Sequence, residues 1–249
     1  MSTYNPFSLE GKTILVTGAS SGIGKATAIA CSKMGAKVVI TGRNSEKLQE
    51  TFSQLGDGCE QILADLNNET DFCHLINCLG NLDGVVHSAG IASTVPFKFI
   101  DRNKLKNIFD VNFFAPVFLM QQLLKKKKLS DFASIVFLAS IDGPITAHIG
   151  NSMYGATKAA ICAMTKALAV ELAIRNIRVN AILPGMIDTP MIRAGNISAV
   201  QLEKDKMTYP LKRYGRPDEI AHAAIYFLSG ASTFTTGASL VVDGGFTLL

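Results

Sequence analysis

The sequence predicts a single α/β domain in which a doubly wound parallel β-sheet carries helices on both faces. Three observations lead to this fold class. Short apolar runs alternate with helical segments along the whole chain, which is the order of elements in such a sheet. The apolar runs are rich in β-branched residues and lack strict polar alternation, as strands buried on both faces do. A glycine-rich turn near the N-terminus joins the first apolar run to the first helix.

The individual elements follow from this alternation in chain order. Strands are expected at Thr13–Thr17, Lys37–Thr41, Glu60–Ala64, Leu82–His87, Ser134–Ala139, Arg178–Leu183 and Ser239–Val242. Helices are expected at Lys25–Met34, Ser45–Leu55, Leu105–Phe109, Phe113–Leu124, Ser152–Arg175 and Pro217–Leu228, and around a core-facing stripe of Phe72, Leu75, Ile76 and Leu79. No linker divides the chain, so residues 1–249 are expected to form one domain.

The first turn has the composition of a phosphate-binding loop. Gly18-Ala19-Ser20-Ser21-Gly22-Ile23-Gly24 stands between the first strand and the first helix. A helix N-terminus presents unpaired N–H groups and the positive end of its dipole, which together bind an anion. Glycines permit the tight turn, the approach of backbone to phosphate and close helix–strand packing. The spacing differs from the general G-x-G-x-x-G fingerprint, so a turn without a ligand is the alternative.

A second motif predicts acid–base chemistry. Tyr154 and Lys158 are four residues apart in an expected helix, so they share one face. A free phenol titrates near ~10, and a neighbouring ammonium group lowers its pKa by favouring the phenolate. We therefore expect Lys158 to lower the pKa of Tyr154, and Tyr154 to exchange a proton with an alcohol or carbonyl oxygen. Ser140 precedes the tyrosine by fourteen residues and follows an expected strand.

The topology places these motifs together. In doubly wound sheets, ligands bind beyond the carboxyl ends of the strands. The turn at Gly18, the segment after His87, Ser140 and Pro184 all follow expected strands. We therefore expect these segments to line one crevice.

Together these segments resemble the short-chain dehydrogenase/reductase family, from about Leu9 to Phe246. The resemblance is carried by Thr17–Gly24, Asp65-Leu66, Asn112, Ser140, Tyr154 with Lys158, Pro184-Gly185 followed by Thr189, and Val241-Val242-Asp243-Gly244-Gly245. Within the family the chain looks like the 3-oxoacyl-acyl-carrier-protein reductase and sugar or steroid alcohol dehydrogenase branch. One segment departs from the family pattern, because His87-Ser88-Ala89-Gly90 replaces Asn-Asn-Ala-Gly. We interpret His87 mainly as a structural replacement for the missing asparagine.

The resemblance implies a Rossmann-type NAD(P)-binding domain and an oxidoreductase that transfers hydride between the cofactor and a carbonyl or alcohol. It implies that Tyr154 donates the proton, that Ser140 hydrogen-bonds the same oxygen, and that Lys158 also holds the nicotinamide ribose. Asn112 would order a water that resupplies the proton; without the resemblance, a helix-bracing amide is an equal interpretation. The expected cofactor contacts are Gly18, Ser20, Ser21, Gly22, Ile23, Gly24, Arg43, Asp65, Leu66, Ala89, Gly90, Tyr154, Lys158, Pro184, Gly185, Ile187 and Thr189. For Asp142 and His148, a turn role and a surface role are favoured over substrate contact.

The end of the second strand favours NADP(H) over NAD(H). An NAD site places an acid about 20 residues beyond the glycine turn, whereas an arginine there accommodates a 2′-phosphate. Gly42 is eighteen residues after Gly24, and Arg43 follows it. Glu46 falls in the first turn of the next helix, where an acid suits the dipole without any ligand. Ser21 is not the basic residue that some NADP-preferring relatives carry, so NAD(H) is the alternative.

Composition argues against several other classes. The five cysteines are odd in number and form no C-x-x-C pair, which predicts neither a disulfide framework nor a metal site. The net charge of +4 is mild, and the basic run Lys125–Lys128 is expected to be a solvated helix end, with no nucleic-acid partner. The apolar runs are too short to span a membrane. The N-terminus lacks the pattern of a signal peptide, so a cytoplasmic location is expected.

The methionine-rich segment at about 186–210 is expected to be a lid over a small-molecule substrate, and the alternative is an ordinary pair of helices that packs on the core. A 3-oxoacyl thioester, a sugar, a steroid or a small ketone would each suit it, and the reaction direction is open. The alternative from another class is a dinucleotide-binding regulator or scaffold that has lost catalysis.

The resemblance also implies a homotetramer or homodimer that pairs the helices Phe113–Leu124 and Ser152–Arg175. Small residues in the second helix support close helix approach, namely Ala156, Ala159, Ala160 and Ala163. The alternative is a monomer whose alanines merely suit helix propensity.

Overall fold

All seven expected strands are present and form one parallel sheet. The computed structural model describes residues 4–193 and 198–249. The strand order is β3-β2-β1-β4-β5-β6-β7, and every neighbouring pair is parallel. The strands are β1 (Thr13–Thr17), β2 (Lys37–Gly42), β3 (Glu60–Leu63), β4 (Leu82–His87), β5 (Leu129–Leu138), β6 (Arg178–Pro184) and β7 (Ser239–Val242). The predicted fold class is confirmed.

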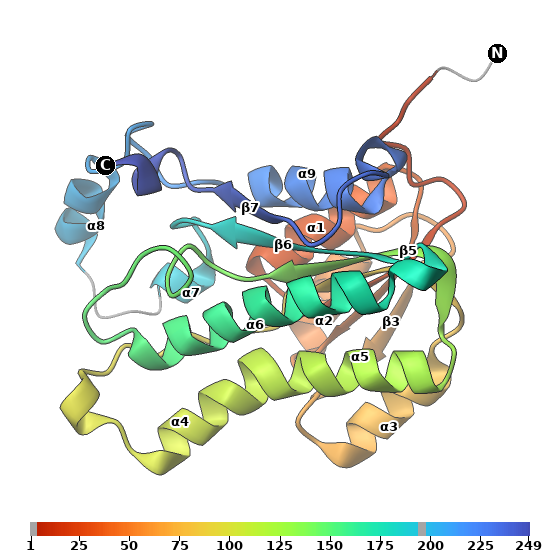
Figure 1. Cartoon of the computed structure of the whole chain (residues 1–249), viewed down its shortest axis with the longest axis horizontal. Coiled ribbons are helices and arrows are strands. Elements are labelled where there is room, and N and C mark those ends of the chain that lie inside the picture. Colours follow the sequence, from red (N-terminus) through yellow and green to blue (C-terminus); the bar gives the residue numbers. More distant parts are fainter. Residues whose placement is uncertain (1–3, 194–197) are drawn as a thin grey trace.

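Helices cover both faces of the sheet (Figure 1). One face carries α1 (Gly22–Lys33), α2 (Ser45–Phe52) and α9 (Pro217–Leu228). The other face carries α3 (Glu69–Cys78), α5 (Ala115–Lys125) and α6 (Ser152–Glu171), and α4 (Arg102–Phe109) packs beside α6. Because both faces are covered, the central strands are apolar on both sides, as the sequence predicted.

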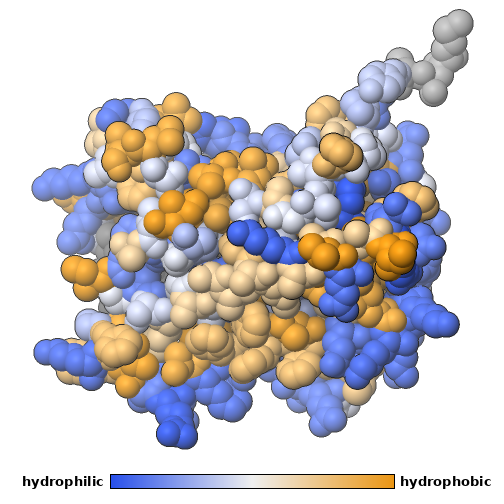
Figure 2. Space-filling view, viewed as in Figure 1, coloured by the Kyte–Doolittle hydropathy of each residue, from blue (hydrophilic) through white to orange (hydrophobic). Residues whose placement is uncertain are grey.

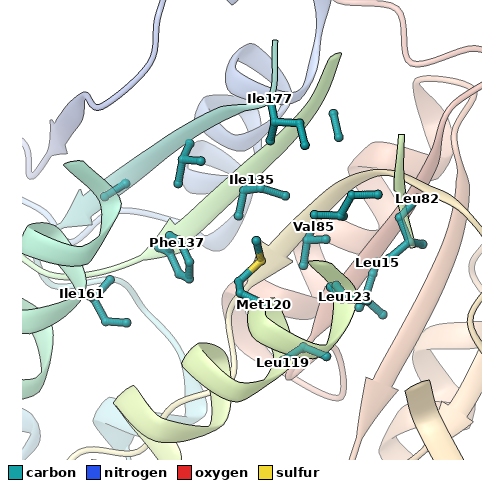
Figure 3. Close-up of a cluster of buried hydrophobic side chains, with 14 of the residues drawn as sticks. Leu15, Leu82, Val85, Leu119, Met120, Leu123, Ile135, Phe137, Ile161 and Ile177 are labelled. Carbon is teal, nitrogen blue, oxygen red and sulfur yellow. The ribbon is translucent and has the colours of Figure 1, made fainter. Parts of the chain in front are cut away.

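The two cores follow the two-residue alternation of the strands. Leu15 belongs to the core under α5, whereas its neighbour Val16 belongs to the core under α1 and α9. Figure 3 shows Leu119, Met120 and Leu123 of α5 against the strand residues of the first core. Both cores are closed by fully buried side chains, so the sheet is a rigid base for the loops at its carboxyl edge.

Several element boundaries differ from the prediction. β5 begins at Leu129, five residues early, because Leu129 pairs with Leu82 ahead of a register irregularity in β4. The helix predicted at Ser152–Arg175 ends at Glu171, and a 3₁₀ turn then leads to Asn176 with a φ of 54°. The helix predicted at Phe113–Leu124 is α5, preceded by a π-helical turn at Asp110–Phe114. The other ends agree with prediction within three residues.

The predicted lid contains two short helices, α7 (Pro190–Arg193) and α8 (Ala199–Lys206). The break predicted at Gly195-Asn196 lies outside the described residues. Within the described ranges, short 3₁₀ turns complete the chain at Phe97–Phe99, Gly230–Ser232 and Phe246–Leu248. Across 4–193 and 198–249, no helix is both long and apolar enough to cross a membrane.

Candidate active site

The motif residues gather at the carboxyl ends of the central strands. Gly18 follows β1, Ser88 follows β4, Ser140 lies beyond β5 and Gly185 follows β6. β1 and β4 are neighbours in the sheet although β2 and β3 separate them in sequence. The chain therefore reverses its winding direction between β1 and β4, and this switch point is where doubly wound sheets bind ligands.

The glycine turn is shaped by backbone contacts that exclude side chains. Gly18 has a φ of 65°, and a Cβ atom there would lie 2.7 Å from the Ala89 Cα atom. A Cβ atom on Gly24 would overlap the Gly18 carbonyl group. Ser21 precedes α1 without a side-chain cap, and α1 has no acid in its first turn. The N-terminus of α1 thus keeps N–H groups and a positive dipole end for an anion, which fits a dinucleotide pyrophosphate.

Residues 185–189 follow β6 and are called the strip below. The strip contacts the glycine turn, as predicted. A Cβ atom on Gly22 would lie 3.2 Å from the Thr189 Cγ2 atom. The Gly185 N–H group donates to the Val242 carbonyl at 3.1 Å, which ties the strip to the C-terminal strand. The Ile187 side chain is buried in the apolar core, and the Ile23 side chain is partly buried against it.

The segment predicted to be a lid is attached to the same strip. The Met186 N–H group donates to the Tyr209 hydroxyl at 3.2 Å. The Tyr209 ring stacks on Phe246, with 4.7 Å between the ring centres. In the C-terminal motif, the Asp243 carboxylate accepts from the N–H groups of Gly245 and Thr247 at 2.9 and 2.8 Å. Tyr209 therefore connects the strip to the C-terminal turn.

Arg43 and Asp65 lie together beside the second and third strands. The Arg43 Nη1 and Asp65 Oδ2 atoms are 3.8 Å apart, and the two side chains are 60% and 38% exposed. A Cβ atom on Gly42 would lie 3.1 Å from the Ser20 Oγ atom. The backbone at Gly42 therefore passes close to the glycine turn and leaves Arg43 accessible at its rim. Leu66 is placed differently, because it lines a small cavity together with His87 and Lys158.

Ser140, Tyr154 and Lys158 come together at the start of α6. Ser140 and Lys158 are 8% and 6% exposed, and the Ser140 side chain hydrogen-bonds the Tyr154 hydroxyl. The Lys158 Nζ atom donates to the Leu138 carbonyl oxygen at 2.8 Å and lies 5.6 Å from the centre of the Tyr154 ring. The end of β5 and the first turns of α6 therefore hold the three side chains in one place.

The expected effect of Lys158 on Tyr154 is wrong for the cofactor-free protein. Burial raises the pKa of Tyr154, the Ser140 hydrogen bond lowers it, and the Asp142 charge raises it further. Lys158 is not among these causes, because its ammonium group is bonded to the Leu138 carbonyl and not to the phenol oxygen. Burial also lowers the pKa of Lys158 to about 8, with the Cys162 charge opposing the shift.

Asn112 braces two parts of the site. Its Oδ1 atom accepts from the Ile91 N–H group at 2.8 Å, and its Nδ2 atom donates to the Ile91 carbonyl at 2.9 Å and to Thr157 Oγ1 at 3.2 Å. Both amide hydrogens are therefore used within the protein. Asn112 belongs to the π-helical turn, and Pro116 four residues later has no N–H group, so the Asn112 carbonyl lacks its usual helical donor. The side-chain amide has no N–H group left for a water.

Asp142 has a larger role than the sequence suggested. It is 6% exposed, and its carboxylate interacts with His148 Nδ1 at 3.2 Å and accepts from Asn151 Nδ2 at 2.8 Å. Asn151 directly precedes α6. The loop after Ser140 is thus fastened to the helix that carries Tyr154. The only sequence signal for this role was an acid placed between the serine and the tyrosine. For His148, the predicted surface position agrees with its half-exposed side chain.

His87 is a fully enclosed histidine. It is 5% exposed, and its ring stacks on Phe137 with 4.6 Å between the centres. Burial lowers the pKa of His87 to about 3, so the ring is neutral at ordinary pH. No polar side chain of the described residues hydrogen-bonds either ring nitrogen. His87 is therefore held by packing and forms no side-chain hydrogen bond with the described residues.

Two further features concern charge and metal binding. No cluster of three or more His, Cys, Asp or Glu residues in 4–193 and 198–249 has the geometry to hold a metal ion. In the basic run, Lys125, Lys126 and Lys127 are exposed at the end of α5, whereas Lys128 donates to the Leu79 carbonyl. Lys125 to Lys127 are thus a solvated helix end, and Lys128 forms a structural hydrogen bond.

Comparison with known proteins agrees with this geometry. A family model described as enoyl-(acyl carrier protein) reductase matches residues 18–247. The 3-oxoacyl-[acyl-carrier-protein] reductase FabG of Rickettsia prowazekii is 37% identical over 238 residues, which cover 95% of this chain and 97% of the relative. The 2,5-dichloro-2,5-cyclohexadiene-1,4-diol dehydrogenase of Sphingobium indicum is 32% identical over 248 residues, covering 97% and 99%.

Solved structures give the same result. A gluconate 5-dehydrogenase from Burkholderia cenocepacia, in complex with NADP and tartrate, superposes with a TM-score of 0.88 at 27% identity, covering 98% of each chain. The family model and the relatives span nearly the whole chain, and the motifs they imply meet at one end of the sheet. The chain belongs to the short-chain dehydrogenase/reductase family and is an NAD(P)-dependent oxidoreductase.

Proposed function

We propose that this protein is an NADP(H)-dependent reductase of ketone carbonyls, of the 3-oxoacyl-thioester type. The observation that carries the proposal is the convergence of Ser140, Tyr154 and Lys158 beside a glycine turn that fits a pyrophosphate. A scaffold that had lost catalysis would have no need of this arrangement, so the non-enzymatic alternative is disfavoured.

Each side chain has a defined task in the reducing direction. The nicotinamide cofactor, when bound, supplies the hydride. Negative charge then grows on the carbonyl oxygen, where Tyr154 donates its proton and Ser140 donates a hydrogen bond. Because burial raises the pKa of Tyr154, the phenol holds its proton at neutral pH, which is the form that reduction needs. Lys158 orients the nicotinamide ribose through its remaining N–H groups, and the Asn112 carbonyl holds a water near Lys158.

The surroundings of Tyr154 support an apolar substrate chain. The Val95 N–H group donates to the Gly150 carbonyl at 2.8 Å, and the Thr94 hydroxyl donates to Asn151 Oδ1 at 3.0 Å. Two loops are thereby joined at the start of α6, next to Tyr154. Their exposed large side chains are Phe97, Phe99, Ile145 and Ile149. Exposed apolar side chains on these two loops suit an acyl chain better than a polyhydroxylated sugar.

A screen of NADPH oxidation tests the function. Substrates are 3-oxoacyl thioesters of increasing chain length, sugars, steroids and simple ketones, and an active-site variant provides the blank. We expect the highest kcat/KM with 3-oxoacyl thioesters, rising with chain length. A preference for NAD⁺ with a sugar or steroid alcohol would instead support the dehydrogenase alternative. Cofactor binding without turnover on any substrate would support a regulator or scaffold.

Cofactor choice gives a separate prediction. Arg43→Ala is expected to weaken NADPH about 10- to 150-fold and NADH little, because a hydrogen bond to a charged group contributes about 1.5–3 kcal/mol. Arg216→Ala is a matched control, since Arg216 is equally exposed at 60% and pairs with Asp218 beside α9. Both cofactors are titrated against each variant. Equal weakening of NADPH and NADH would show that Arg43 does not contact the 2′-phosphate.

We further propose a homo-oligomer, most simply a tetramer, built on α5 and α6. Figure 2 shows an apolar band over these helices on the face that Figure 1 presents. Its large exposed members are Phe114, Phe118, Val170 and Ile174. On α6 the exposed positions between Tyr154 and Val170 include Ala156, Ala163 and Ala167, which allow close approach of another helix.

Light scattering at micromolar concentration tests this assembly. We expect a mass several times the chain mass of 26.6 kDa. Val170→Glu is expected to lower the mass without unfolding the chain, because Val170 is 81% exposed in the single chain. A fully active wild-type monomer would contradict the proposal.

A further inference from the structure

We propose that His87 is a positioning residue that holds one buried water molecule against the ammonium group of Lys158. The starting point is an imidazole with no hydrogen-bond partner for either nitrogen among the described residues. His87 is 5% exposed, so bulk water does not supply those partners. The effect of this water on catalysis rests on the proposed function, whereas the presence of the water does not.

The sheet register determines where His87 points. Thr17 of β1 pairs with His87 of β4, and His87 pairs with Phe137 of β5. Paired residues of parallel strands project to the same face, and Phe137 belongs to the core beneath α5 and α6. Figure 3 shows Phe137 and Ile161 in that core. The stacking of His87 on Phe137, at 13° between the ring planes, occupies a ring face and leaves the edge with the nitrogens for other contacts.

A cavity of about 10 Å³ lies at this place. That volume is close to the room one water requires, and a buried water needs about two to four polar partners. The polar side chains on its lining are His87, Lys158, Asn112 and Thr17. Of these four, only His87 has no hydrogen bond within the protein, and native proteins avoid leaving a buried polar group unpaired.

The chemistry of the two main partners sets the direction of the hydrogen bonds. Lys158 has three N–H donors, and one of them goes to the Leu138 carbonyl. His87 stays neutral because burial lowers its pKa to about 3, so one ring nitrogen is always an acceptor. A water that accepts from Lys158 and donates to His87 gives the acceptor nitrogen of His87 a partner and gives Lys158 a second one. The water therefore links the Lys158 head group to β4 and favours its charged form.

Few other titratable groups lie close enough to Lys158 to shift its pKa. Burial lowers its pKa to about 8, and the titratable neighbours on α6 are Tyr154 and Cys162. Asp142, on the loop after β5, acts on Tyr154. Across the cavity, His87 is the other titratable side chain of the lining. The pH at which Lys158 loses its proton therefore reports whether the proposed water is bound.

The first experiment compares pH profiles. His87→Phe keeps the ring that stacks on Phe137 and removes both nitrogens. We expect the alkaline limb of kcat/KM, near pH 8 in the wild type, to move down by about one unit, since the ammonium loses an acceptor. His87→Gln restores a polar partner and should return the limb toward the wild-type value. Ile161→Val changes the apolar cavity lining alone and should leave the limb in place.

The second experiment locates the water without relying on activity. A high-resolution crystal structure of the cofactor-free protein is expected to show a water within hydrogen-bond distance of His87 and Lys158, which is lost in His87→Phe. Absence of that water in the wild type, or an unchanged alkaline limb in a folded His87→Phe variant, would overturn the proposal. If the wild type reduces no ketone, the proposed function fails while the density still decides the water. If His87→Phe does not fold, the pH profile of His87→Gln and the electron density of the wild type test the proposal instead.

Discussion

Tyr154→Phe is expected to lower turnover about 10²- to 10⁴-fold, the usual contribution of a positioned general acid. The change removes one hydroxyl and keeps the aromatic ring, so the packing of α6 is preserved. NADPH affinity is expected to stay within a few-fold of the wild type, because the glycine turn that fits the pyrophosphate is untouched. Single-turnover kinetics and a fluorescence titration of NADPH measure the two quantities separately.

A matched control is available in α9. The Tyr226 hydroxyl lies 3.2 Å from the Thr235 hydroxyl, away from the motif residues. Tyr226→Phe should therefore leave kcat unchanged. Near wild-type turnover in Tyr154→Phe would remove Tyr154 from the proton-transfer role, and an equal loss in both variants would indicate a general structural effect.

The parts of the site that depend on spacing along one element were predictable. Tyr154 and Lys158 share a helix face because they are four residues apart. The glycine turn was predictable because its glycine spacing reflects contacts within the turn, such as that of Gly24 with the Gly18 carbonyl group. The order of strands and helices then placed Ser140 at the same edge of the sheet. In each case the physical cause is either local or topological.

The parts that depend on contacts between distant segments were not predictable. The direction of the Tyr154 pKa is set by burial and by Asp142, not by the neighbouring lysine. The hydrogen bonds of Asn112 to Ile91 and Thr157 join segments that are 21 and 45 residues away. The enclosure of His87 results from three-dimensional packing around Phe137. Periodicity and motif spacing carry no information about such contacts.

Gly143→Ala is expected to be among the most damaging single substitutions in the chain. Gly143 has a φ of 100°, and a Cβ atom there would overlap the Gly155 carbonyl group. Backbone strain of this kind costs about 1–3 kcal/mol, and overpacking adds about 1–3 kcal/mol. A loss of about 2–6 kcal/mol in unfolding free energy is expected, measured by denaturant titration.

The same change should also reduce activity in the molecules that remain folded. Gly155 follows Tyr154, so a displaced Gly143 loop moves Ser140 and Asp142 relative to the tyrosine hydroxyl. Two glycines separate the causes. Gly11 has a φ of 75° and no atom within 4 Å of an added Cβ, so Gly11→Ala measures strain alone. Gly80 has open space and no positive φ, so Gly80→Ala should be close to neutral. If Gly143→Ala matches Gly11→Ala in stability and retains full kcat, the close packing of the loop on α6 does not hold the catalytic groups together.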